Sequence, residues 1–300
     1  MKRRISLLTA TVLALLLLLS ACSGGTSSGG ASSAGTNPSS AGTASAPPAA
    51  EVRKINVVGY TGNKPFVYLD ENGVLQGYEP EVLRKIDELL PQYEFTYDGM
   101  DFSAMPVALE SGSAQIAVCM LVKSEERLEK FIFPEHASTL APMHFVLKEG
   151  RTDIQTFDDF AGNVLVSGNS GYEYIYVVKW NEKHADKPII FDFYTEANFN
   201  DTYDRIAKGE VDGVLTYAES FQYAVSELGI TGVELSPVVF VEDTYFMIAQ
   251  KETELRDAID GALEQLQNDG TLSALATEYL GRDVFTEFGD LFTAQGQWQQ

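Results

Sequence analysis

The chain has 300 residues, and its 43 Asp and Glu residues outnumber its 21 Lys and Arg residues. The formal charge of −22 disfavours nucleic acid as a partner, because the phosphate backbone is itself negative. The carboxylates are scattered along the sequence rather than clustered, so the charge indicates solubility and not a cation site.

Residues 1–21 have the order of a secretory signal peptide. Three basic residues at positions 2–4 precede an apolar run at 7–19, which is shorter than the roughly 20 residues of a membrane-spanning helix. The run ends in LSAC at 19–22, which resembles a bacterial lipobox. We therefore expect cleavage before Cys22, lipidation of Cys22, and a change of formal charge from −22 to −25 as the three basic residues leave. The alternative is an ordinary signal peptide in which Cys22 is incidental.

Residues 22–50 form the lipidated cysteine and a linker. From 23 to 50 the sequence is almost entirely Ser, Gly, Ala, Thr, Pro and Asn, a composition that cannot bury apolar surface. We expect a flexible tether that lets a domain beginning near Glu51 reach away from a membrane. A second membrane-spanning run does not follow, which disfavours a receptor kinase or a channel.

Cysteine and histidine usage disfavours disulfides and metal sites. After Cys22 the only cysteine is Cys119, so no intramolecular disulfide can form in the mature chain. His136, His144 and His184 lack the close spacing of zinc ligands. We expect no metal and no cofactor.

Apolar runs alternate with helical periodicity from residue 51 onward, which predicts an α/β fold with mostly parallel strands. Pro80 is expected to open a helix, and Ser103 to cap a short helix that ends at Leu109. The first group of strands is expected at 55–58, 93–97 and 116–119, with a turn at 70–73.

A second group of elements follows the same pattern. Strands are expected at 164–167, 189–193 and 211–216, and helices after Gly171, at 202–208 and at 219–228. Two further helices are indicated by apolar residues at 255, 259, 263 and 266 and at 272, 275 and 279. The sequence beyond Phe285 gives no clear prediction.

Six segments, in this order, resemble the extracellular solute-binding proteins that serve polar amino-acid ABC transporters (solute-binding protein family 3). The resemblance covers roughly 55–285 and depends on the order and spacing of the segments. They are the opening strand with Pro65-Phe66, DENGVLQGYEPEVL (70–83), DFSAMPVALESG (101–112), KSEERLEKFIFP (123–134), GEVDGVLTY (209–217) and NDGTLSALATEYLG (268–281).

This resemblance implies a two-lobed, periplasmic-binding-protein-like fold with two hinge crossings and a ligand in the cleft. The boundaries that it implies are lobe one at 51–140, a hinge at 141–145, lobe two at 146–240, a second hinge at 241–245, a return to lobe one at 246–290 and a tail at 291–300.

The resemblance implies that an arginine and a backbone turn hold a ligand carboxylate. By resemblance, Arg127 makes a forked contact with it, which suits guanidinium geometry. The alternative is a surface arginine paired with Glu126 or Glu129. The turn before the helix after Gly171 can present backbone N–H groups to an anion, with Ser170 and Gly171 as contacts, although Ser170 can equally cap the helix.

Aromatic residues are implied to wall the ligand. Phe102 stands where the family has an aromatic residue over the ligand side chain, and Tyr60 ends the first strand in a loop that lines the cleft. For Phe66, ordinary core packing is the stronger interpretation.

Two positions depart from the family pattern. Where a hydroxyl residue is usual the chain has Val122, preceded by Met120 and Leu121, and where an aspartate is usual it has Tyr217. A buried ammonium without a carboxylate is costly. Either another acid substitutes, or the ligand lacks an α-amino group; the candidate acids are Glu219, Glu242 and Asp243. Met120, Val122 and Tyr217 stay in the predicted site, and Cys119 is expected to be a buried apolar thiol.

The function implied by the resemblance is capture of an amino acid or related small carboxylate without catalysis. The expected partners are this ligand, an ABC transporter permease, and the cell membrane through the lipid anchor, outside the cytoplasm. A monomer is expected. The alternatives are a sensory domain, or an enzyme on the same fold that resembles cyclohexadienyl dehydratases.

Overall fold

The computed structural model describes residues 52–169, 171–194 and 198–292, which belong to a compact unit spanning Ala49–Gln300. The predicted signal peptide, Cys22, the linker and residues 293–300 lie outside the described residues. No helix in the described ranges is both long and apolar enough to cross a membrane.

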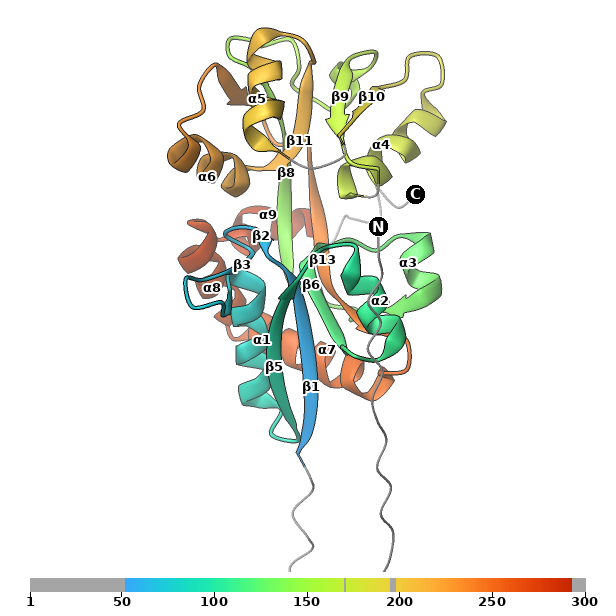
Figure 1. The fold of residues 1–300 in the computed structure, drawn as a ribbon, viewed down its shortest axis with the longest axis vertical. Helices are drawn as coiled ribbons and strands as arrows, with labels where there is room; N and C mark the ends of the chain where they lie inside the picture. Colours follow the sequence, from blue (N-terminus) through green and yellow to red (C-terminus); the bar gives the residue numbers. More distant parts are fainter. Residues whose placement is uncertain (1–51, 170, 195–197, 293–300) are drawn as a thin grey trace, which may run out of the picture. The chain divides into compact units, whose positions relative to one another are not determined.

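One mixed sheet organises this unit, with the strand order β10-β9-β11-β8-β13-β6-β1-β5 (Figure 1). At one end β1 pairs in parallel with β5 and β6, and at the other β9 pairs in parallel with β10 and β11. We call the first group lobe one and the second lobe two. Their bounds are β1 Arg53–Tyr60, β5 Tyr93–Met100, β6 Ile116–Leu121, β9 Val164–Ser167, β10 Ile190–Phe193 and β11 Gly213–Tyr217.

Two long strands join the lobes. They are β8 (Thr139–Lys148) and β13 (Phe240–Ala249), which pair with each other in antiparallel fashion from Phe240↔Met143 to Thr244↔Thr139. Beyond that overlap, β8 pairs antiparallel with β11 and β13 pairs antiparallel with β6. The expectation of mostly parallel strands therefore holds for the outer strands of each lobe and not for the crossing strands. Two short strands extend the sheet beside the crossing strands: β7 (Phe131–Ile132) pairs with β13, and β12 (Val233–Leu235) pairs with β8.

A small three-stranded sheet, not predicted from the sequence, surrounds the turn that begins at Asp70. The carboxylate of Asp70 accepts hydrogen bonds from the backbone N–H groups of Asn72 (2.8 Å) and Val74 (2.9 Å), which fixes the turn. The strands are β2 (Gly62–Asn63), β3 (Val67–Leu69) and β4 (Leu75–Gln76), paired antiparallel in that order.

The described helices agree with most predictions but differ in several details. Helix α1 begins at Tyr78, so Pro80 is its third residue; a first-turn proline costs no intrahelical hydrogen bond. Ser103 precedes α2, but its side chain makes no capping hydrogen bond. Helix α9 lies beyond the last prediction, anchored by the fully buried Val284. The helices are α1 Tyr78–Leu89, α2 Ala104–Ser111, α3 Glu125–Lys130, α4 Tyr172–Lys183, α5 Phe199–Lys208, α6 Ala218–Leu228, α7 Thr253–Asn268, α8 Thr271–Leu280 and α9 Val284–Phe292, with a 3₁₀ turn at Asp158–Phe160.

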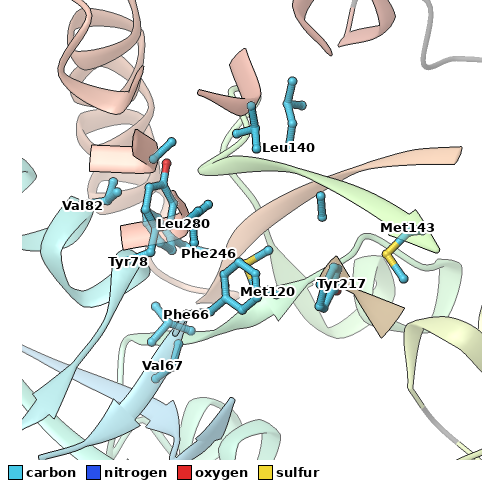
Figure 2. Packing of buried hydrophobic residues seen from close by; sticks show 14 of the residues in the cluster. Phe66, Val67, Tyr78, Val82, Met120, Leu140, Met143, Tyr217, Phe246 and Leu280 are labelled. Atoms are coloured by element: carbon cyan, nitrogen blue, oxygen red, sulfur yellow. The ribbon is translucent and has the colours of Figure 1, made fainter. Parts of the chain in front are cut away.

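The main hydrophobic core runs through both lobes along the crossing strands. Helices α1, α7 and α8 pack against one another in lobe one. Figure 2 shows part of this core, with Tyr78, the first residue of α1, near Phe246, and with Phe66 and Tyr217 in the same cluster. The ring centroids of Phe66 (lobe one) and Tyr217 (lobe two) lie 5.2 Å apart, so the apolar packing continues from one lobe to the other.

Candidate functional site

A cavity of about 480 Å³ is lined by residues of both lobes. Lobe one supplies the ends of β1 and β6, the residues before α2, and α3. Lobe two supplies the turn from β9 to α4, strand β11 and the start of α6. Six of the predicted site residues line this cavity: Tyr60, Phe102, Met120, Arg127, Gly171 and Tyr217. Ser170 lies outside the described residues. Contact between a ligand and these six lining residues remains a prediction.

Arg127 faces this cavity from the short helix α3. Ser124 caps the helix by accepting a hydrogen bond from the Arg127 backbone N–H (3.2 Å). The guanidinium Nη1 donates to the Val122 carbonyl oxygen at 2.8 Å, and burial lowers the pKa of Arg127. Among the described residues, no carboxylate forms an ion pair with Arg127, because Glu126 pairs with Lys130 instead (3.1 Å). The cavity therefore contains a cation without an anionic partner from the described chain.

Val122 does not line the cavity. Its side chain is fully buried, and its backbone carbonyl holds the Arg127 guanidinium. The residue that replaces the family's hydroxyl thus contributes through its main chain to the position of the arginine.

Glu173, in the first turn of α4, also lines the cavity, and sequence reasoning missed it. The residue is 6% exposed, and its carboxylate accepts hydrogen bonds from the Gly168 N–H (3.3 Å) and the Tyr194 hydroxyl (3.2 Å). Burial raises its pKa, and no cation of the described residues pairs with it. The sequence signal was ambiguous, because an acid in a first helical turn is usually explained by the helix dipole.

Glu173 also explains the glycine beside it. A Cβ atom on Gly171 would lie 2.4 Å from Glu173 Oε2, so any side chain there would displace the carboxylate. The absence of a side chain at Gly171 therefore leaves room for the Glu173 carboxylate at the cavity.

Tyr217 closes one wall of the cavity. It is 3% exposed, and burial raises the pKa of its hydroxyl well above the usual value. The acids considered as substitutes for the missing aspartate, Glu219, Glu242 and Asp243, are not among the lining residues. Glu242 lies on β13 instead, and burial raises its pKa to about 8. The carboxylate in the cavity is that of Glu173.

Met120, another lining residue, has an unusual backbone. Its φ of 50° lies in the left-handed region, which is uncommon for a residue with a long side chain. The Met120 N–H donates to Glu79 Oε2 at 2.7 Å, and Glu79 is fully buried. Burial raises the pKa of Glu79 to about 8. A buried acid thus holds the strained residue that lines the cavity.

Aromatic residues and a thiol complete lobe one's share of the wall. Tyr60 and Phe102 meet edge to face with ring centroids 6.2 Å apart. Cys119 lines the cavity beside them and is half-buried, in contrast to the expected buried thiol, and burial raises its pKa. Within the described ranges no group of three or more His, Cys, Asp or Glu side chains is arranged to hold a metal ion.

Comparison with known proteins identifies relatives of the whole domain. Residues 55–282 match the family of bacterial extracellular solute-binding proteins, family 3. The L-cystine-binding protein TcyK of Bacillus subtilis (strain 168) is 30% identical, over 73% of this chain and 81% of that protein. The L-cystine-binding protein TcyJ of the same organism is 28% identical, over 72% of this chain and 80% of that protein.

A solved structure has the same fold at similar sequence identity. It is the crystal structure of the probable amino-acid ABC transporter extracellular-binding protein ytmK from Bacillus subtilis. It superposes with a TM-score of 0.66 and 28% identity, and the match covers 77% of this chain and 99% of that one. The two-lobed periplasmic-binding-protein fold predicted from the sequence is confirmed.

Proposed function

Because this chain belongs to the bacterial extracellular solute-binding proteins of family 3, we propose that it is the amino-acid-binding component of an ABC transporter, acting as a monomer and without catalysis. The names of its relatives support this proposal, since they describe proteins that bind L-cystine or amino acids and belong to ABC transporters. The two lobes that enclose the ligand would then be lobe one, at 51–140 and 246–290, and lobe two, at 146–240.

The presence of one cation and one anion in a single cavity carries the proposal. Arg127 comes from lobe one and Glu173 from lobe two, and neither has an ionic partner among the described residues. An amino-acid head group supplies both missing partners, with its carboxylate on Arg127 and its ammonium on Glu173. Because both groups are partly removed from water, each interaction would be stronger than at an open surface.

The remaining wall residues would enclose the ligand's side chain. Tyr60, Phe102, Met120 and Tyr217 offer apolar and aromatic surface, and Gly171 offers a backbone N–H beside the helix start. Ser170 stays in the proposed site by resemblance alone. Val122 would act indirectly, by holding Arg127.

Replacing Glu173 with Gln tests the amino-acid assignment. A thermal-shift screen of amino acids first selects the tightest ligand. Calorimetry then compares that ligand with its analogue that lacks the α-amino group. We expect Glu173→Gln to weaken amino-acid binding by about tenfold or more, because a buried ammonium loses its counter-charge, and to leave binding of the analogue nearly unchanged.

The same comparison can refute the assignment. The Glu173 carboxylate also accepts the Gly168 N–H, so its loss could disturb the turn rather than the charge balance. Equal weakening of both ligands would mean that Glu173 only shapes the turn. Leu228→Gln, at an exposed position at the end of α6, is a control that should change neither affinity.

We propose that two segments of the crossing strands, 141–145 and 241–245, act as the hinge. Strand β8 pairs with β11 of lobe two, strand β13 pairs with β6 of lobe one, and the two strands pair with each other; both segments fall in or beside this mutual pairing. Rotation there would change the cleft while leaving the parallel strands of each lobe intact.

Lipidation of Cys22 is proposed as the membrane anchor outside the cytoplasm, supported by the lipobox-like LSAC and by the extracellular family. Replacing Cys22 with Ala should move the protein from the membrane fraction to the soluble fraction, measured by fractionation and immunoblotting. Mass spectrometry of the wild type should find a lipid on an N-terminal Cys22. A Cys22→Ala protein that stays with the membrane, together with unmodified Cys22 in the wild type, would show that the anchor is wrong.

A further inference from the structure

Glu79 is bonded to a residue of the cavity wall but does not itself line the cavity. It is the second residue of α1 and is fully buried. Its Oε2 accepts the backbone N–H of Met120 at 2.7 Å, and Met120 does line the cavity. The φ of Met120 is 50°, a left-handed conformation that persists for a long side chain only where the surroundings hold it. The Glu79 carboxyl is one such support.

The other oxygen of the Glu79 carboxyl connects this support to both crossing strands. Oε1 lies 3.5 Å from the hydroxyl oxygen of Ser138, the residue that precedes β8. The Ser138 hydroxyl donates to the Thr244 carbonyl oxygen on β13 at 3.1 Å, and the Ser138 N–H donates to the same oxygen at 2.8 Å. Thr244 belongs to the proposed hinge segment 241–245, and its hydroxyl donates to Met120 Sδ at 3.7 Å.

These four residues form one buried cluster between the hinge segment and the cavity wall. Glu79, Ser138 and Thr244 are fully buried, and Met120 is 2% exposed. Water therefore cannot replace a lost partner without a local opening of the fold. An N–H that loses its acceptor here is costly, and a rotation of the Met120 backbone out of the left-handed region would relieve both that cost and the steric strain. Such a rotation would displace the Met120 side chain from the wall.

A purely structural role for Glu79 is the alternative, since a buried acid can stabilise a fold without influencing a ligand. Two observations favour a role at the site. Among the described residues, Met120 is the only one other than glycine that has a positive φ, and the Glu79 bond goes to this residue. The same residue lines the cavity.

We propose that Glu79 is a positioning residue for ligand binding. Its acceptor oxygen keeps Met120 in the left-handed conformation, and this conformation sets the part of the lobe-one wall against which the ligand packs. Through Ser138 and Thr244 the same carboxyl ties this wall to the hinge segment, so the wall and β13 move together. The effect on ligand affinity rests on the proposed function, whereas the position of the wall does not.

Alkylation of Cys119 by N-ethylmaleimide reports the position of the wall without any ligand. Cys119 precedes Met120, lines the cavity and is the only cysteine after Cys22, so the full mature chain with Cys22→Ala carries a single thiol. The measurement is made below the Glu79 pKa of about 8, where Gln is a close mimic of the protonated acid. We expect Glu79→Ala to speed alkylation by about tenfold or more, and Glu79→Gln, which keeps the acceptor, to change it by less than about twofold.

Glycine at the strained position tests whether Glu79 acts through the Met120 backbone. Glycine adopts a positive φ without steric cost, so it needs less support from an acceptor. In the Met120→Gly background, Glu79→Ala should therefore change the alkylation rate by less than about threefold. Leu266→Ala is a control for lost stability, because Leu266 is buried on α7 outside the cavity lining. It should leave the alkylation of Cys119 nearly unchanged.

Calorimetry with the amino acid that the thermal-shift screen selects measures the effect on binding in the same variants. Glu79→Ala should weaken affinity by about tenfold, and Glu79→Gln by less than about twofold. In the Met120→Gly background most of the Glu79→Ala effect should disappear, whatever affinity Met120→Gly itself loses. Leu266→Ala should bind as the wild type does.

The outcomes separate this inference from the proposed function. Equal acceleration of alkylation by Glu79→Ala and Leu266→Ala would show that Glu79 only stabilises the fold. Equal effects of Glu79→Ala with Met and with Gly at position 120 would show that it does not act through this backbone. If Arg127→Ala weakens binding and Glu79→Ala does not, the proposed function stands and the inference is wrong. If alkylation changes as expected but no amino acid binds, the wall is positioned as described and the proposed function is wrong.

Discussion

Arg127→Ala is expected to weaken amino-acid binding by about 2–5 kcal/mol, roughly 30- to 4,000-fold in Kd. The guanidinium is partly buried, held by the Val122 carbonyl at 2.8 Å, and has no carboxylate partner among the described residues. In the variant, a ligand carboxylate inside the cavity would still be removed from water but would have no arginine partner among the described lining residues. Isothermal titration calorimetry with the tightest ligand of the thermal-shift screen measures the change.

Two further variants make the result specific. Arg127→Lys keeps the charge but loses the planar fork, so an intermediate loss of affinity is expected. Arg256→Ala removes a partly exposed arginine that does not line the cavity and should leave affinity unchanged. If Arg127→Ala binds as tightly as the wild type, the predicted carboxylate site is misplaced.

Glu79→Gln is expected to change how stability depends on pH. Burial raises the pKa of Glu79 from 4.5 to about 8, so the folded protein keeps a proton that the unfolded chain has lost. The contribution of Glu79 to stability is fully present below pH 4.5 and is lost as pH rises through about 8. The loss is on the order of 5 kcal/mol. Gln cannot ionise and can still accept the Met120 N–H, so this loss should disappear.

Urea denaturation at several pH values between about 5 and 9 measures this difference. Near pH 5 the Glu79→Gln variant and the wild type should have similar free energies of unfolding, and near pH 9 the variant should be the more stable protein. Glu79→Ala should be less stable than both near pH 5, because the buried Met120 N–H loses its acceptor. Parallel pH profiles for Glu79→Gln and wild type would contradict a protonated Glu79 in the folded protein.

Local pattern predicted most individual elements well. Strand β9 has the expected bounds, and α6 begins one residue from the expected start. Such elements follow from side-chain periodicity and from helix-ending glycines, both of which act over a few residues. Helix α9 escaped prediction because the helical character of its sequence depends on packing against β8 and β13, far away in the chain.

The sequence by itself determined the α/β class, the arrangement in two groups of elements and, through ordered motifs, the family. It also identified Arg127, Tyr60, Phe102 and Tyr217 as candidate cavity residues. Only the tertiary structure decided which acid reaches the cavity. Glu173, and not Glu219, Glu242 or Asp243, lies there because the turn at Gly171 brings its carboxylate back toward Gly168.

A second cavity of about 440 Å³, lined by residues 61–64 and 68–71 with Ser220 and Tyr223, was likewise decided by tertiary structure alone. Lys64 and Tyr223 are far apart in the sequence, and neither belongs to a recognisable motif. They meet because the turn after β1 in lobe one and helix α6 in lobe two face the same space across the crossing strands. Local periodicity carries no information about such a contact. The contact depends on long-range strand pairing between residues about a hundred positions apart, as in Phe240↔Met143.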